Sequence, residues 1–149
     1  MDYIKDAHTF LKDHKLGVLS VSTPDGKPWG AAIYCVFAHD AFYFLTHTES
    51  EKYKLLRSNP NAAIVVTDDY KQITVQASGV VSEIELGDEH DEIMRFVAGV
   101  HPPGQFAWVP PVSKMHDGGT ALIKLAPERI MYSKFNTQNG EPYVVDILK

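Results

Sequence analysis

Residues 42–60 read Phe-Tyr-Phe-Leu-Thr-His-Thr-Glu-Ser-Glu-Lys-Tyr-Lys-Leu-Leu-Arg-Ser-Asn-Pro, and this stretch decides the fold that the sequence predicts. Its first four residues are aromatic or aliphatic, which is typical of a buried strand. Thr48 and Glu51 match the Thr-x-x-Glu capping box that marks a helix start, and Pro60 marks the helix end. The stretch therefore predicts a strand that runs straight into a short helix.

The junction between this strand and this helix has the chemistry of an anion site. Hydroxyl and imidazole groups gather there, on Thr46, His47, Thr48 and Ser50. Lys52 adds a cation, and the backbone N–H groups of a first helical turn are free, so the combination suits a phosphate. The alternative is that Thr48 and Ser50 only cap the helix and that Lys52 is a solvated surface charge. The local sequence alone favours this alternative.

Length and composition predict one globular domain over residues 1–149, since 44% of the chain is hydrophobic and no tract is of low complexity. A formal charge of −5 with scattered Lys and Arg argues against binding to nucleic acid or to an anionic membrane. Cys35 is the single cysteine, and its apolar neighbours predict a buried thiol. With no signal peptide and no apolar run long enough to cross a bilayer, we expect a cytoplasmic protein.

Two further helices are expected from the spacing of apolar residues. Residues 2–15 have helical spacing, with Asp2 as the expected N-cap and Gly17 as the expected terminator. Another helix is expected to open at Asp88, where acidic residues suit the positive end of the helix dipole. Its expected buried stripe is Ile93, Phe96, Val97 and Val100.

Runs rich in β-branched and aromatic residues predict the remaining strands, over 18–22, 29–37, 62–67, 73–84, 120–125, 130–135 and 143–147. The turn signals between them are short, as at Asp25-Gly26 and Asn139-Gly140. Short turns make antiparallel pairs. The sequence therefore predicts a mainly β fold, an antiparallel barrel that is closed or nearly closed, with flanking helices over its ends.

Most familiar catalytic and metal-binding motifs are missing. The seven histidines do not fall into a recognised ligand spacing and no cysteine pair assists them, so no metal site is expected. No Gly-x-Ser-x-Gly elbow, Walker loop or Gly-x-Gly-x-x-Gly dinucleotide motif occurs. Hydrolase, NTPase and Rossmann functions therefore lose their usual support, and no residue is assigned as a catalytic acid or base.

Several stretches together resemble a known superfamily: Gly17-Val-Leu-Ser-Val-Ser-Thr, Asp25-Gly-Lys-Pro-Trp, the apolar strand to Val36, residues 44–64, and residues 73–79. In this order they resemble the pyridoxamine 5′-phosphate oxidase-like, FMN-binding split-barrel superfamily. The resemblance covers roughly residues 4–85. It is more specific for the fold than for an activity. The tail through Trp108 and Tyr132 is similar to a smaller branch and not to the pyridoxamine phosphate oxidases proper.

The resemblance implies a homodimer with two FMN sites at the subunit interface. The flavin would run along the backbone of the second strand, at Ala31, Ala32, Ile33 and Tyr34. Its phosphate would be held by Thr46, His47, Ser50 and Lys52. Thr74 or Gln76 on the fifth strand would approach the ring or the ribityl chain, and Trp108 of the partner would cover the ring.

Two departures from the family pattern imply weak FMN binding. Members that bind FMN strongly often carry an arginine at the start of the second strand and a basic residue just before the phosphate lysine; here Gly30 or Ala31, and Glu51, stand in those places. Each missing charge-assisted contact removes about 1.5 to 3 kcal/mol. No basic cluster matches the family's pyridoxal phosphate site, which argues against vitamin B6 oxidation.

The function implied is that of a flavin-dependent oxidoreductase or reductase acting on an unidentified small molecule, with FMN carrying the redox chemistry. One alternative is a binding protein of the same fold without turnover, either a flavin carrier or a haem binder with an axial histidine. Another is a structural or regulatory dimer with an empty groove. The sequence leaves FMN, a deazaflavin and haem open as cofactors.

Overall fold

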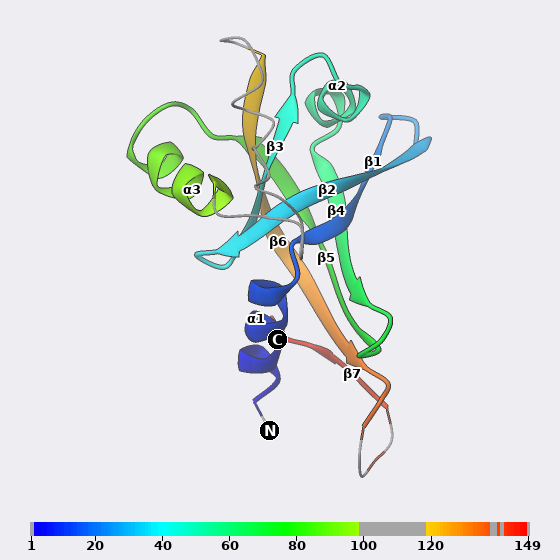
Figure 1. The fold of residues 1–149 in the computed structure, drawn as a ribbon. Coiled ribbons are helices and arrows are strands. Elements are labelled where there is room, and N and C mark those ends of the chain that lie inside the picture. The colour runs from blue at the N-terminus through cyan, green and yellow to red at the C-terminus, as the bar shows by residue number, and fades with distance from the viewer. Residues whose placement is uncertain (1, 99–118, 138–139, 141, 149) are drawn as a thin grey trace.

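The chain's computed structural model describes residues 2–98, 119–137, 140 and 142–148. Within these residues a curled antiparallel sheet is flanked by three helices (Figure 1). In chain order the elements are α1 (Tyr3–Asp13), β1 (Leu16–Ser22), β2 (Pro28–Ala38), β3 (Ala41–His47), α2 (Glu51–Ser58), β4 (Asn61–Asp68), β5 (Ile73–Glu83), α3 (Asp88–Ala98), β6 (Thr120–Lys134) and β7 (Tyr143–Asp146). None of these helices has the length and apolar character needed to cross a membrane.

The sheet closes into a barrel because β3 pairs on both of its sides. The strand order is β3-β2-β1-β4-β5-β6-β7, and β3 pairs with β6 as well as with β2. All of these pairs are antiparallel. β7 lies outside the closed ring, along the final residues of β6. The predicted antiparallel barrel with flanking helices is confirmed.

The barrel is split between β2 and β3. These two strands pair only from Cys35↔Phe44 to Ala38↔Ala41, although β2 begins at Pro28. Over residues 28–34, β2 pairs with β1 on one side, and no strand in the described part of the chain pairs with its other side. Residues 45–47 of β3 meanwhile pair with β6. We call the gap between residues 28–34 of β2 and residues 45–47 of β3 the split; the two strands diverge there (Figure 1).

Two helices contribute to the barrel's main core. Ala7, Phe10 and Leu11 of α1 join the interior cluster, and so do Tyr53 and Leu56 of α2. The side chains inside the barrel include Leu19, Ile33, Phe44, Ile64, Val66 and Leu125. The predicted N-cap of α1 is confirmed, because the Asp2 carboxylate accepts the Lys5 N–H at 3.0 Å.

The third helix packs on the outside of the barrel. Ile93 and Val97 of α3 bury themselves against Val36, Tyr43 and Leu122 from β2, β3 and β6. Phe96 was expected in the same stripe, and this prediction is wrong, because its side chain is 50% exposed. The contact surface of α3 is narrower than the apolar pattern indicated. Val100 lies outside the described residues.

Two predicted helix boundaries are also wrong. The N-cap of α2 is Ser50 and not Thr48, because the Ser50 hydroxyl accepts the Tyr53 N–H. Gly17 does not end α1, which stops at Asp13; Gly17 lies within β1. A Cβ at Gly17 would stand 2.9 Å from the Val65 carbonyl oxygen, so glycine permits the close approach of β4.

The strands predicted over 120–125 and 130–135 are one long strand, β6. Pro127 lies inside this strand, although proline cannot donate to a sheet ladder. The pairing of β5 with β6 continues past Pro127 through a register shift, where Ser78 pairs with Arg129 and Gly79 pairs with Pro127. A Cβ at Gly79 would overlap the Ala126 carbonyl group, so glycine allows the strand to continue.

Candidate functional site

The start of α2 brings two hydroxyl groups together beside the split. Thr46 Oγ1 lies 3.0 Å from Ser50 Oγ, which also accepts the Tyr53 N–H at 3.2 Å. The Ser50 N–H in turn donates to the His47 carbonyl oxygen at 3.0 Å. These bonds fix the turn between β3 and α2, so Thr46, His47 and Ser50 form one compact group.

Two backbone donors remain at the start of this helix. Helices leave their first N–H groups without an intrahelical partner. At α2 the amides of Ser50 and Tyr53 are bonded, whereas those of Glu51 and Lys52 have no partner among the described residues. Unpaired N–H groups at the positive end of the helix dipole attract an anion.

Lys52 adds the cation to this group. Its side chain is partly buried, and this burial lowers the pKa of its ammonium group because desolvation disfavours the charge. No carboxylate pairs with it in the part of the chain that the structure describes. The neighbouring Glu51 is exposed and is the one opposing charge in the first turn of α2. A bound phosphate would restore the solvation that Lys52 loses.

His47 is held in one tautomer by the backbone. Its Nδ1 accepts the Glu49 N–H at 3.0 Å. The neutral ring therefore carries its proton on Nε2. The histidine thus presents an N–H donor, as a phosphate oxygen requires.

Residues 31–34 of β2, the strip predicted to run along the flavin, lie across the split from β3. The Ala32 side chain points outward and is exposed, whereas Ile33 points into the barrel and is 5% exposed. Ala31 and Tyr34 are half-buried. The backbone of this strip borders the split, as do Thr46 and His47 from β3. The fold thus brings the two predicted groups to the two sides of one gap.

The predicted residues of β5 do not join this group. The Thr74 hydroxyl lies 2.7 Å from that of Thr67. Gln76 is exposed and shares an outward row with Ala32, but Val18 and Val65 stand between them. Three strand spacings separate the ends of the row by roughly 14 Å. The roles of Thr74 and Gln76 stay predictions, and Trp108 lies outside the described residues.

A protein-family model described as pyridoxamine 5′-phosphate oxidase matches residues 4–134. The chain belongs to the pyridoxamine 5′-phosphate oxidase family. This confirms the resemblance and extends it beyond residue 85. None of the curated proteins matches the sequence.

Solved structures show the same fold at low sequence identity. A haem binding protein from Mycobacterium smegmatis is 18% identical with a TM-score of 0.72, and the match covers 98% of this chain and 58% of that one. A pyridoxamine 5′-phosphate oxidase-related, FMN binding protein from Nostoc punctiforme is 15% identical with a TM-score of 0.62, covering 96% and 94%. An F420 reductase is 21% identical with a TM-score of 0.61, covering 83% and 94%.

In this member of the pyridoxamine 5′-phosphate oxidase family, Tyr53 anchors the helix that begins at the candidate anion site. Its hydroxyl donates to Glu83 Oε1 at 2.9 Å and accepts from Arg57 at 3.2 Å. Glu83 is the last residue of β5, so the contact ties α2 to the barrel. The sequence prediction missed this residue, although the spacing of Tyr53 and Arg57 places them on one helix face.

The remaining candidate groups do not contribute a site. The buried thiol predicted at Cys35 is confirmed, since its side chain is 3% exposed and burial raises its pKa to about 12. Such a thiol is not a nucleophile near neutral pH. Among the described residues, no group of three or more His, Cys, Asp or Glu could hold a metal ion.

Proposed function

We propose that the chain binds FMN along the split, with the phosphate at the start of α2 and the flavin ring along residues 31–34 of β2. The observation that carries this proposal is the meeting of two different groups at one gap. Residues 28–34 of β2 border the gap on one side, along an edge that pairs with no strand in the described part of the chain. Thr46 and His47 border it on the other side and lead into Ser50, Lys52 and the two amides that have no partner among the described residues. Both groups fit the parts of a flavin nucleotide.

The residues would bind and orient the cofactor in distinct ways. Lys52 and the amides of Glu51 and Lys52 would neutralise the phosphate, and His47 would donate from Nε2. A bound flavin supplies electron or hydride transfer. The proposed activity is therefore that of a flavin-dependent oxidoreductase or reductase acting on a small molecule.

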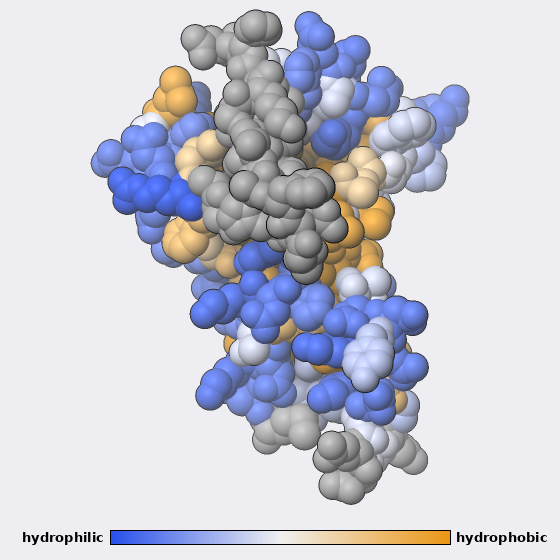
Figure 2. All heavy atoms as spheres, viewed as in Figure 1, coloured by the Kyte–Doolittle hydropathy of each residue, from blue (hydrophilic) through white to orange (hydrophobic). Residues whose placement is uncertain are grey.

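We further propose that the site is completed in a homodimer. On the outward face of β1, β2, β4 and β5, Leu16 is 56% exposed, Val18 is 47% exposed and Val80 is 39% exposed. The helices pack elsewhere, at the barrel core and over β2, β3 and β6. Figure 2 shows an apolar patch over the region of β1, β2 and β4. A second copy of the same face would cover it.

The phosphate role is tested by titrating the protein with FMN and with riboflavin, which lacks the phosphate. We expect Lys52→Ala to weaken FMN binding about tenfold or more, because one charge-assisted contact is lost. Riboflavin affinity should not change. Lys54→Ala is the matched control, since Lys54 lies on the same helix and is exposed. Equal losses for FMN and riboflavin would contradict the phosphate assignment.

Turnover separates an enzyme from a flavin carrier. FMN-loaded protein is mixed anaerobically with NADPH or NADH, and the visible absorbance of the flavin is followed. Bleaching that outpaces free FMN supports a reductase. Unchanged absorbance with both donors supports the alternative of a carrier without turnover.

A haem or deazaflavin ligand is the second candidate. It is favoured by Glu51, whose carboxylate opposes a phosphate, and by the likeness in fold to a haem binding protein and an F420 reductase. The tautomer of His47 counts against haem, because Nε2 would first have to lose its proton to bind iron. Titration with haemin tests this: a Soret shift that is lost in His47→Ala would establish haem ligation.

A further inference from the structure

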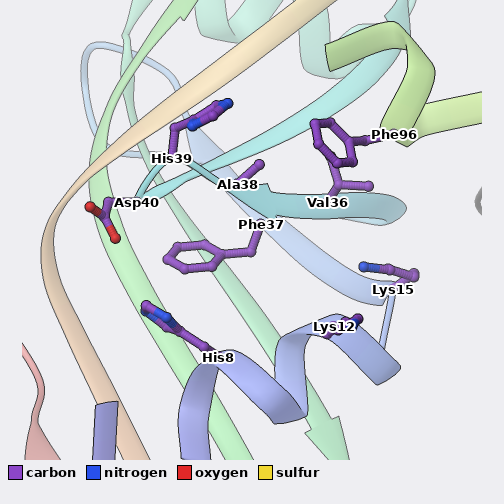
Figure 3. A pocket seen from close by; sticks show the side chains of 9 residues that line it. All are labelled: His8, Lys12, Lys15, Val36, Phe37, Ala38, His39, Asp40 and Phe96. Carbon is purple, nitrogen blue, oxygen red and sulfur yellow. The ribbon is translucent and has the colours of Figure 1, made fainter. Parts of the chain in front are cut away.

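A second candidate site is a pocket between α1, the end of β2 and α3. Its volume is about 570 Å³. The lining residues, drawn in Figure 3, are His8, Lys12, Lys15, Val36, Phe37, Ala38, His39, Asp40 and Phe96. Pockets that hold small molecules usually measure about 300 to 1,000 Å³. The size therefore suits a small organic ligand.

One side of this pocket is cationic. Lys12 reaches it from α1, and Lys15 from the link between α1 and β1. Lys15 is half-buried and its ammonium donates to the Leu11 carbonyl oxygen at a long 3.4 Å. Neither lysine forms an ion pair with a carboxylate in the described part of the chain. Two cations in a chain of net charge −5 make this a locally positive site.

The acidic groups near the pocket form no ion pair with Lys12 or Lys15 among the described residues. Asp40 lines the pocket, and Asp13 of α1 acts on Lys15 electrostatically. Glu92 is engaged by His39, at 3.0 Å between Nε2 and Oε1. Asp40 is thus the one carboxylate among the described lining residues.

The other side of the pocket is apolar. Val36 and Phe96 form one wall, and Phe96 is 50% exposed (Figure 3). Phe37 lies against the His8 ring, with 5.0 Å between the ring centroids. An exposed phenylalanine beside two ammonium groups offers both parts of an amphipathic contact.

This pocket is separate from the proposed FMN phosphate site. Asp40 precedes the first residue of β3, whereas His47 is the last residue of β3. Six residues of the strand lie between them, so the two residues are roughly 20 Å apart along β3. The two sites therefore lie at opposite ends of the same strand.

We propose that this pocket binds a small organic carboxylate with an aromatic or branched apolar body. Lys12 and Lys15 bind the carboxylate group, and Val36, Phe37 and Phe96 cover the body. A carboxylate fits better than a phosphate ester, because most of the pocket surface is apolar and the described lining residues include no arginine and no helix N-terminus. The ligand is thus distinct in chemistry from FMN.

The test compares 2-naphthoate with the uncharged 2-naphthylmethanol by ligand-observed NMR titration, on the full chain with and without saturating FMN. We expect the acid to bind at least about tenfold more tightly than the alcohol, and added salt to weaken it. The double variant Lys12→Ala/Lys15→Ala should lose this preference. Lys5→Ala, an exposed lysine on the same helix, should keep it.

Three outcomes would overturn the proposal. They are equal binding of acid and alcohol by the wild-type protein, an equal loss in Lys5→Ala, and displacement of naphthoate by FMN. The first comparison needs no variant, so it holds even where a substitution unfolds the chain. A protein that binds naphthoate but not FMN would retain this proposal while refuting the flavin site.

Discussion

At Cys35 the barrel interior determines the chemistry of a single side chain. The thiol is 3% exposed, and burial raises its pKa from 9.0 to about 12, because the thiolate would lose its hydration. The nearby Lys15 lowers this pKa only in part. Lys15, in contrast, is half-buried at the edge of the barrel, where a ligand from solution can reach its ammonium group.

Because the pKa of Cys35 is raised, the free energy of unfolding should change with pH in the alkaline range. Above pH 9 the unfolded thiol releases its proton while the folded thiol keeps it, so the free energy of unfolding falls as pH rises. Between pH 9 and 11 we expect a loss of about 1.4 kcal/mol per pH unit from this group. Urea unfolding measures it as the difference in slope between wild type and Cys35→Ala. Parallel slopes would show that the thiol ionises equally in both states.

At the scale of single elements, α2 depends on one side-chain anchor. Tyr53→Phe removes the bond to Glu83 and leaves Arg57 without its acceptor, which should destabilise the fold by about 1 to 3 kcal/mol. Chemical denaturation measures this loss. Tyr70→Phe is the control, because that side chain is 91% exposed. If the two variants are equally stable, the Tyr53 contact does not hold the helix.

The order and type of the elements could be predicted from the sequence, because apolar periodicity and turn residues are local signals. The continuity of β6 could not be predicted, since the proline at position 127 is accommodated by a glycine in another strand. The N-cap of α2 was misplaced by two residues for a related reason. Ser50 and Thr48 are both capping residue types, and only the bond to Tyr53 distinguishes them.

At the scale of the whole molecule, the exposed sheet face predicts the assembly. Val18→Glu places a charge in the middle of this face and should convert a dimer to a monomer, because the carboxylate would be desolvated at the interface. Light scattering after gel filtration measures the mass. Leu86→Glu is the control, since Leu86 is 87% exposed and lies beyond the end of β5. A dimeric Val18→Glu would place the interface elsewhere.

Only part of the candidate sites could be predicted from the sequence. The residues around Ser50 and Lys52 were predicted, because they follow one another in the chain. The split was not derivable from the residues alone, since it arises because β2 pairs with β3 only from Cys35 onward. The second pocket joins α1, β2 and α3, and no local pattern indicated that Lys12 and Phe96 would line the same cavity.

The double pairing of β6 dictates when the chain can fold. Its partners in β3 lie between 73 positions (His47 and Thr120) and 83 positions (Phe42 and Leu125) earlier in the sequence. A nascent chain emerging from the ribosome therefore exposes the edges of β3 and β5 until residues 120–134 have been made. Such distant pairing slows folding to roughly milliseconds or longer. During that interval the two open edges are where a chaperone would bind or where neighbouring chains would aggregate.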